Sequence, residues 1–338
     1  MIKLTKNIRR NYHSSRNMEL GLSMVELMVA ITIGMILLAG LMQIFINNKQ
    51  AYRLQDNIGL LQENGRFAIE MLTGSIKLAD HWGGNTPTDI NQNTGGVTIT
   101  GIGSCNEAWI LDVTEGIRGY SGAANIGSVT DLPSNCIAAS DYVANTDIIA
   151  IRYSDGRNST GTGASATSGN IYLRSAIGTE AQIIDGSAGA PTNIPDQDGT
   201  YSFPYKTELY FVRPCAIKNG TTCTDGIPTL SRLTLNGSTL EQEGLVEGVE
   251  QLKFEYGSDS NADGNVDRYD YASAVSDWDN VINVRASILV RSDTKDSAFT
   301  DAGPYVFFGD ASNKYNVPSA DQNYHRKQYT RLITIRNR

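Results

Sequence analysis

Residues 21–46 read GLSMVELMVAITIGMILLAGLMQIFI, and this apolar stretch decides how the rest of the chain is interpreted. From position 22 onward Glu26 is its only charged residue, and almost no polar residue precedes Gln43. About 20 apolar residues are enough for a helix to cross the hydrocarbon core of a bilayer, whereas a core helix of this length usually carries a polar stripe. We therefore predict a transmembrane helix over residues 22–46.

The segment ahead of this stretch is strongly basic. It carries five Lys and Arg residues against one acid, Glu19, and such an excess marks the cytoplasmic side of a membrane segment. A secretory signal is cut after its apolar region at a small-residue site, but nothing like A-x-A follows Ile46. Gly21, on the near side of the apolar run, is the better cleavage position, because glycine lets a protease approach the backbone closely.

The charge balance argues against a nucleic-acid partner. The chain carries 28 basic and 36 acidic residues, a net charge of −8, and without residues 1–21 the remaining 23 basic and 35 acidic residues give −12. A nucleic-acid-binding protein would carry a basic surface instead. An enzyme is not expected either, because the sequence holds no GxSxG, HExxH or P-loop motif, and no Ser or Cys motif accompanies His81 or His325.

Glu26 needs an explanation, because a carboxylate at mid-bilayer costs about 2.5–3.5 kcal/mol on insertion. One explanation is an acid in the first helical turn, which the helix dipole favours. The other follows from cleavage at Gly21, which would create an amine at Leu22, one helical turn from Glu26. An ammonium and a carboxylate attract strongly in apolar surroundings, where each is costly alone. The same pair can form between Glu26 of an arriving chain and Leu22 of its neighbour.

The stretch GLSMVELMVAITIGMILL resembles the class III signal of type IV pilins and pseudopilins. In that family a dedicated peptidase cuts after the glycine and methylates the new N-terminus, and a glutamate occupies the fifth mature position. Gly21, Leu22 and Glu26 match these positions, although Leu22 stands where the family most often has Phe. The resemblance implies cleavage after Gly21, methylation of Leu22 and a role for Glu26 in assembly.

The helix is expected to continue beyond the membrane to about Asp80, where His81-Trp82-Gly83-Gly84 would end it. Its second part is amphipathic, with apolar residues at spacings of three and four. Glycines along it permit close packing or local melting, or are simply tolerated. The expected packed face is formed by Ile58, Leu61, Gly65, Ile69, Leu72, Ile76 and Ala79, and the glycines are Gly34, Gly40, Gly59, Gly65 and Gly74.

Beyond the helix the sequence changes to short β-branched and aromatic runs between Gly, Asn, Asp and Ser clusters, which predicts strands and loops. We expect an α+β fold, a long N-terminal helix packed on a β-rich pilin-like domain, with a hairpin turn at Asn236-Gly237 and long loops over 155–170 and 185–200. The alternative is a division of the globular region into two domains near residue 200. The expected divisions are a cytoplasmic leader (1–21), a transmembrane half-helix (22–46), an amphipathic half-helix (47–82) and the globular domain (83–338). The predicted strands are Val97–Ile102, Ile148–Tyr153, Ile171–Arg174, Glu208–Arg213, Leu230–Leu235, Val249–Tyr256, Ile282–Arg291 and Gln328–Arg336.

The wider chain resembles the larger minor pilins of the PilW type through QENGRFAIEMLTGSIKLADHWGG, GLVEGVEQLKFEYG, INVRASILVRS and YTRLITIRNR. The resemblance implies a low-abundance structural subunit that helps to start or cap type IV pilus assembly. Its implied partners are other pilins, the prepilin peptidase and the inner-membrane assembly platform. It implies a single-pass inner-membrane protein whose domain lies in the periplasm and then in the pilus. The alternatives are a type II secretion pseudopilin and a Ca²⁺-dependent adhesin at a filament tip.

The four cysteines, Cys105, Cys136, Cys215 and Cys223, all lie beyond the membrane stretch. An even number of cysteines in an oxidising compartment predicts two disulfides. Of the three possible connectivities, we expect the local one, Cys105–Cys136 and Cys215–Cys223. A metal site of cysteines is not favoured, because no CxxC occurs.

Residues 259–270 read DSNADGNVDRYD and match the spacing of an EF-hand calcium loop, with Asp in place of the final Glu. The alternating oxygen ligands would converge on one ion, and Gly264 would permit the sharp turn. The flanking sequence is typical of strands, so this would be a Ca²⁺ loop in a β context; the alternative is a solvated turn without an ion. Bound Ca²⁺ would rigidify the domain. The predicted ligands are Asp259, Asn261, Asp263, Asn265 through its carbonyl, Asp267 and Asp270.

Overall fold

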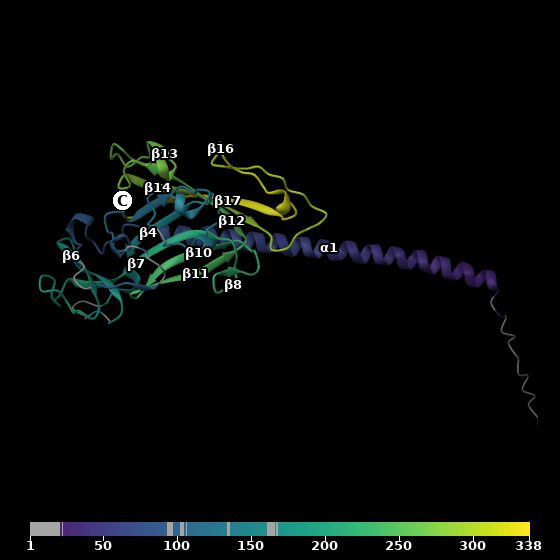
Figure 1. Cartoon of the computed structure of the whole chain (residues 1–338), viewed down its shortest axis with the longest axis horizontal. Helices are drawn as coiled ribbons and strands as arrows, with labels where there is room; N and C mark the ends of the chain where they lie inside the picture. Colours follow the sequence, from purple (N-terminus) through teal and green to yellow (C-terminus); the bar gives the residue numbers. More distant parts are fainter. Residues whose placement is uncertain are drawn as a thin grey trace, which may run out of the picture. The chain divides into compact units, whose positions relative to one another are not determined.

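A computed structural model describes residues 21, 23–92, 97–101, 105, 107–133, 136–160, 166 and 168–338 of the chain. Most of the predicted leader (1–20) and Leu22 lie outside the described residues. The chain divides into two compact units between Gln55 and Asp56. Figure 1 shows a long helix and a β-rich domain, which confirms the predicted α+β fold class.

The N-terminal helix α1 runs from Met24 to Ile76, over 53 residues. An 18-residue window within it has a mean hydropathy of 2.4 and no buried residue. By length and composition alone, this helix is able to cross a membrane. A short second helix, α2, spans Glu107–Ile110. The 3₁₀ turns are η1 (Pro87–Asp89), η2 (Ile126–Ser128), η3 (Ala139–Asp141), η4 (Gly156–Asn158), η5 (Ala272–Ala274) and η6 (Ser319–Asp321).

The second part of α1 packs on the β-rich unit with the expected periodicity. Its buried residues begin at Leu61 and recur at spacings of three and four up to Ile76. The spacing also places Ile58 on this face, but Ile58 is 40% exposed, so the packed face begins one turn later than predicted.

The end of α1 also differs from the expectation, since the helix stops at Ile76 and not at Asp80. The N–H groups of Leu78 and Ala79 bond to carbonyls three residues back, which tightens the last turn. Asp80 then adopts a φ of 62°, and its N–H donates to the carbonyl of Arg152 in the sheet. The chain therefore leaves the helix where the sheet offers a hydrogen-bond partner.

The larger sheet has nine strands among the described residues, in the order β1-β6-β5-β7-β10-β11-β2, with β3 and β4 joined through β7. The long strand β7 pairs with β5 along its first part, Thr200–Pro204, and with β4 along its second part, Tyr205–Tyr210. The strands are β1 (Ile90–Asn91), β2 (Thr100–Gly101), β3 (Ile117–Tyr120), β4 (Ile148–Ser154), β5 (Ile171–Ala176), β6 (Glu180–Asp185), β7 (Thr200–Arg213), β10 (Thr229–Asn236) and β11 (Thr239–Glu247).

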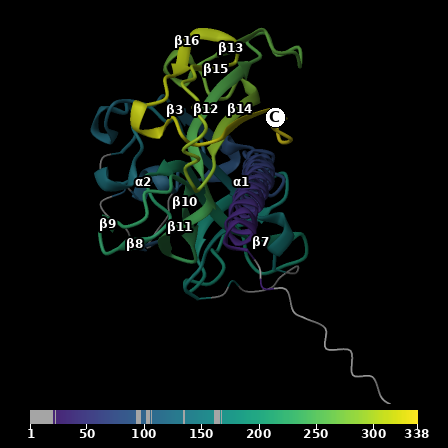
Figure 2. The ribbon, with the colours of Figure 1, turned by 90° about the vertical axis from the view of Figure 1, so that its right-hand side faces the viewer.

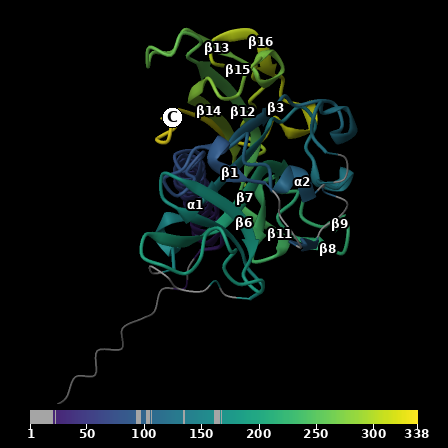
Figure 3. The same ribbon diagram turned by 90° about the vertical axis from the view of Figure 1, so that its left-hand side faces the viewer.

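The smaller sheet has the order β13-β12-β14-β17, with antiparallel neighbours. Figures 2 and 3 show it above the larger sheet, with a separate hairpin, β15–β16, at the top of both views. The remaining strands are β8 (Lys218–Asn219), β9 (Thr222–Cys223), β12 (Val249–Ser258), β13 (Arg268–Asp270), β14 (Val281–Arg291), β15 (Tyr305–Phe307), β16 (Asp310–Tyr315) and β17 (Arg326–Thr334).

Two apolar cores lie on opposite faces of the larger sheet. Ile149 and Ile151 of β4 contribute to the core that contains the packed face of α1 and the inner face of the smaller sheet. Ile148 and Ala150 of the same strand contribute to the second core, which Trp82 and the loop segments complete. Because both faces are covered, β4 reads as a continuous apolar run and not as an alternating one.

Three local expectations need correction. The described part of the strand expected at Val97–Ile102 is only the two-residue β2, and Ile102 lies outside the described residues. The two loop residues of the β10–β11 hairpin are Gly237 and Ser238, one position later than Asn236-Gly237, because Asn236 still pairs with Thr239. The split near residue 200 is wrong, since the compact unit is continuous from Asp56 to Arg338.

Candidate functional site

The first turn of α1 is closed by a capping box. The N–H groups of Val25 and Glu26 lie 3.2 and 3.4 Å from the hydroxyl oxygen of Ser23, to which they donate. In return, the Ser23 N–H donates to Oε2 of Glu26 at 2.9 Å. Ser23 therefore fixes the start of the helix at Met24. The charged residues in the sequence do not by themselves identify Ser23 as the N-cap. The S-x-x-E spacing of Ser23 and Glu26 is the sequence signal that indicates it.

Glu26 keeps one carboxylate oxygen free for another partner. Only its Oε2 takes part in a hydrogen bond within the described part of the chain, which leaves out Leu22. Glu26 and Gly21 are both exposed, and apolar side chains cover the helix surface beyond them. The capping box also holds the carboxylate near the positive end of the helix dipole. Oε1 is thus an oriented acceptor on an otherwise apolar surface, suited to a cationic group from another chain.

A close approach between α1 and β17 fixes the packed half of the helix. A Cβ atom added at Gly65 would lie only 2.1 Å from Cε2 of Tyr329, so the ring occupies the space that a side chain would need. The Tyr329 hydroxyl donates to the carbonyl of Leu61 at 3.2 Å, and Arg331 pairs with Glu70 at 2.5 Å. Of the possibilities for the glycines in α1, close packing holds at Gly65. At Gly34, Gly40, Gly59 and Gly74 an added Cβ would meet no atom of the described residues within 4 Å.

The end of α1 is held by the C-terminal residues. The side-chain amide of Asn337 donates to the carbonyl of Ala79 at 2.8 Å, which satisfies a group that the end of a helix leaves unpaired. Arg338 forms an ion pair with Asp80, and Asp80 also accepts a hydrogen bond from the indole of Trp82 at 3.1 Å. Residues more than 250 positions apart therefore fix how the chain leaves the helix.

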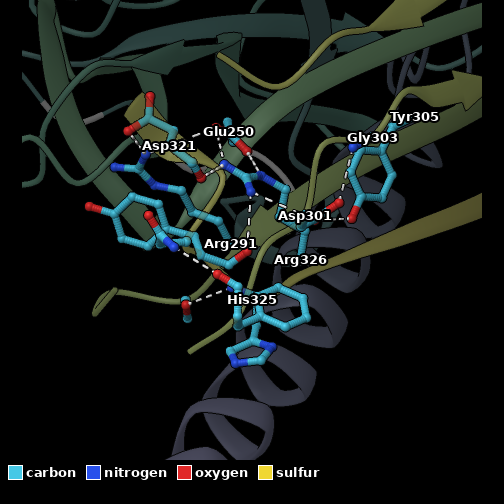
Figure 4. A network of polar contacts seen from close by, with 12 residues as sticks. Glu250, Arg291, Asp301, Gly303, Tyr305, Asp321, His325 and Arg326 are labelled. Carbon is cyan, nitrogen blue, oxygen red and sulfur yellow. Dashed lines mark hydrogen bonds and ion pairs between the residues drawn. The ribbon is translucent and has the colours of Figure 1, made fainter. Parts of the chain in front are cut away.

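A buried polar network attaches residues 292–325 to the smaller sheet (Figure 4). Its centre is Arg326, whose side chain is fully buried and whose Nε lies 2.6 Å from Oε2 of Glu250. Glu250 also accepts from the hydroxyl of Tyr315 at 2.9 Å, and Arg291 lies 3.9 Å from it. Asp301 approaches Arg326 to 3.6 Å. Burial, together with the Glu250 carboxylate, raises the pKa of Tyr315, so the phenol keeps its proton and its donor role.

The four cysteines form the two local disulfides that the spacing favours. Cys105 is joined to Cys136 and Cys215 to Cys223, with Cα–Cα distances of 4.4 and 5.5 Å. The second disulfide closes the β8–β9 hairpin, and the first ties the segment before α2 to the loop that precedes β4. Both bonds brace connections that contain little regular structure.

The acidic loop connects β12 to β13, so its strand context is as predicted. The carboxylate of Asp259 accepts from the N–H groups of Asp263 and Gly264, at 3.2 and 2.7 Å. The carboxylate of Asp263 accepts from the N–H of Asn265 at 2.8 Å. The first half of the loop is thus shaped by hydrogen bonds between side chains and its own backbone.

The remaining expected ligands are also engaged. Asp267 accepts from the N–H and the hydroxyl of Ser260, which together lower the pKa of its carboxyl. Asn261 donates to Asp263 at 3.3 Å, and Asp270 pairs with Arg268 at 2.6 Å. Across the residues that the structure describes, no group of three or more His, Cys, Asp or Glu side chains is arranged to hold a metal ion. A cation would have to compete with these donors, and Ca²⁺ binding at this loop stays a prediction.

Comparison with known proteins gives matches at both ends of the chain. Residues 216–337 match the family described as Type IV Pilus-assembly protein W, and residues 16–42 match the prokaryotic N-terminal methylation motif. A solved structure of a type IV-like pilin from Thermus thermophilus is similar over 84% of this chain and 96% of its own, with 10% identity and a TM-score of 0.32. No curated protein matches. The two family matches contain Glu26 and its capping box at one end, and the Glu250 network with β17 at the other.

Proposed function

We propose that this chain, a type IV pilin of the PilW type, is a minor structural subunit that helps to start or cap pilus assembly. The single observation that carries the proposal is the geometry of Glu26, whose carboxylate is held by Ser23 and keeps one oxygen free on an exposed apolar helix. Such a group needs a cationic partner before it is surrounded by lipid or by other helices. The Leu22 amine of a neighbouring subunit, exposed by cleavage after Gly21, meets that need.

The proposed pair explains why assembly would be specific. An unpaired carboxylate and an unpaired ammonium are each costly in apolar surroundings, and both costs fall when the two groups meet. The exposed helix surface from Met24 to Ile46 provides the non-directional part of the association. The ion pair adds a single preferred stagger between neighbouring helices, because only one alignment brings the two groups together.

The proposed role also sets a path for the protein. The basic leader stays in the cytoplasm until the prepilin peptidase removes it, and the β-rich domain faces the periplasm before the subunit enters the pilus. The proposed partners are other minor and major pilins, the peptidase and the inner-membrane assembly platform. The role is structural rather than enzymatic. Among the sequence-based alternatives, the description of the matched family favours a pilus over a type II secretion system.

N-terminal mass spectrometry tests the processing step directly. We expect the protein from sheared pili to begin at a methylated Leu22, and the protein from membranes to be a mixture of processed and unprocessed chains. A protein from pili that still begins at Met1 would contradict the proposal.

Two substitutions separate the charge of Glu26 from its capping role. Glu26→Gln keeps the capping box, because Gln also serves at this position, but removes the charge. Glu26→Ala removes both. We expect both variants to be processed and both to be depleted from pili. If Glu26→Gln enters pili as well as the wild type does, the carboxylate charge is not needed and the proposed ion pair is wrong.

A further inference from the structure

In the part of the chain that the structure describes, most edge strands of the two sheets are short or partly covered, but one long edge is open. Short edge strands prevent unwanted pairing, and the edge strands β1, β2, β13 and β3 have only two to four residues each. β11 is long, but β2 pairs with its start and a β-bulge disturbs its end. β17 has nine residues and pairs with β14 on one side, and no other described strand pairs with it. Its second edge therefore offers a long row of backbone donors and acceptors.

A groove of about 640 Å³ runs beside this edge, between β17 and the packed half of α1. Its lining combines the apolar side chains of Tyr329 and Ile69 with three basic residues, Arg66, Lys327 and Arg331, and two acids, Glu63 and Glu70. A strand added to β17 would direct alternate side chains into this groove, because side chains alternate between the faces of a sheet. The groove thus provides the side-chain pockets that strand addition requires.

The charges in the groove select the kind of strand that fits. Lys327 and Arg331 are four residues apart on one face of β17, and both are at least partly exposed. Glu70 neutralises Arg331 only weakly, because the two side chains of that pair are 57% and 40% exposed and water screens the attraction between them. A strand with two acids four residues apart, and an apolar residue between them over Tyr329, would complement this face. On the opposite face, Leu332 is 55% exposed and favours a second apolar contact.

The same charges disfavour pairing between two copies of this edge in the register that sets Tyr329 opposite Tyr329. Two antiparallel β17 strands centred on Tyr329 would place Lys327 of each copy opposite Arg331 of the other. Like charges directly opposite each other destabilise a strand pair. We therefore propose that the free edge of β17 binds an acidic extended segment of a different pilin subunit as an added strand. This inference rests on the proposed function for the identity of the partner, but its binding chemistry is testable without a pilus.

The test uses the full chain in detergent micelles and a labelled nine-residue peptide of Val and Thr with Glu at positions 3 and 7. A matched peptide carries Lys at the same two positions. We expect the Glu peptide to bind about tenfold more tightly in fluorescence anisotropy, which corresponds to about 1.4 kcal/mol from two cross-strand charge pairs. We also expect slower amide exchange in β17 when the Glu peptide is bound, and weaker binding at high salt.

Charge reversal makes the test specific to this edge. The double variant Lys327→Glu and Arg331→Glu should prefer the Lys peptide, whereas Lys314→Glu, an exposed change on β16, should leave the preference unchanged. Absence of binding by the Glu peptide, or a preference that the double variant does not reverse, would overturn the proposal. So would self-association of the chain that the double variant abolishes, since that result would assign the edge to a second copy. Because peptide binding does not require Glu26, failure here is distinct from failure of the proposed function.

Discussion

The close contact between Gly65 and Tyr329 leads to a quantitative prediction about helix α1. In an exposed helix position, Gly→Ala stabilises by about 1 kcal/mol because alanine has the better helix propensity. At Gly65 the added Cβ would lie 2.1 Å from the Tyr329 ring, so the ring must move. Such overpacking costs about 1–3 kcal/mol, and losing the hydrogen bond from Tyr329 to Leu61 adds about 1 kcal/mol. We expect Gly65→Ala to destabilise the protein by about 1–3 kcal/mol.

Gly74→Ala is the matched control. It lies in the same helix, nine residues further on, and its added Cβ would meet no atom within 4 Å in the part of the chain that the structure describes. We expect this variant to stabilise by up to about 1 kcal/mol. Unfolding of the full chain in detergent, followed by tryptophan fluorescence against urea concentration, measures both changes. Both substitutions have the same helix-propensity gain, so a difference between their changes in the free energy of unfolding reports the packing at Gly65.

A double-mutant cycle tests the assigned cause. In a Tyr329→Ala background the ring is absent, so Gly65→Ala should no longer destabilise and should behave like Gly74→Ala. If Gly65→Ala stabilises the wild-type protein, or if its cost persists without the Tyr329 ring, the close approach is not the reason for this glycine.

Three further predictions concern the rest of the domain. Glu250→Ala leaves the buried guanidinium of Arg326 without its carboxylate and should lower the free energy of unfolding in urea by about 3–5 kcal/mol. Glu70→Ala breaks an exposed pair and should lower it by less than about 1 kcal/mol. Equal losses of stability in the two variants would contradict the structural role of the Glu250 network. Burial raises the pKa of Asp147 above 3.8, so the folded state binds this proton more readily than the unfolded chain does. Stability should therefore fall as pH rises from about 3.8 through the folded-state pKa, and Asp147→Asn should flatten this part of the profile measured by thermal unfolding. If the loop 259–270 binds Ca²⁺, a chelator should lower the melting temperature, and calorimetry should detect Ca²⁺ binding; an unchanged melting curve without calorimetric binding would refute it.

The helix and the disulfides show how far local patterns reach. The spacing of three and four along α1 identifies its packed face from Leu61 to Ile76, because a helix repeats its faces at that period whatever it packs against. Cysteines close in sequence pair locally, as Cys215 and Cys223 do. The same periodicity wrongly places Ile58 on the packed face, since this residue is 40% exposed. The point at which the sheets begin to cover the helix depends on strands far along the chain.

Glu26 is a case in which the sequence carries nearly all of the information. The acid, the glycine before the apolar run and the S-x-x-E spacing are all local, and a capping box forms from residues within one helical turn. The acidic loop shows the reverse. Its spacing matches a calcium-binding pattern, but the hydrogen bonds that hold Asp259 and Asp263 come from backbone geometry that residue spacing does not specify.

The sequence by itself determined the apolar membrane-length helix, its capped start at Ser23 and the β-rich character of the domain beyond the helix, since each depends on neighbours within a few residues. Only the tertiary structure decided that Gly65 receives the ring of Tyr329, that Glu250 meets Arg326, and that β17 is left at an open edge. These features depend on which distant strands pair. Strand order is set by the summed packing of both cores, and no local pattern encodes that sum.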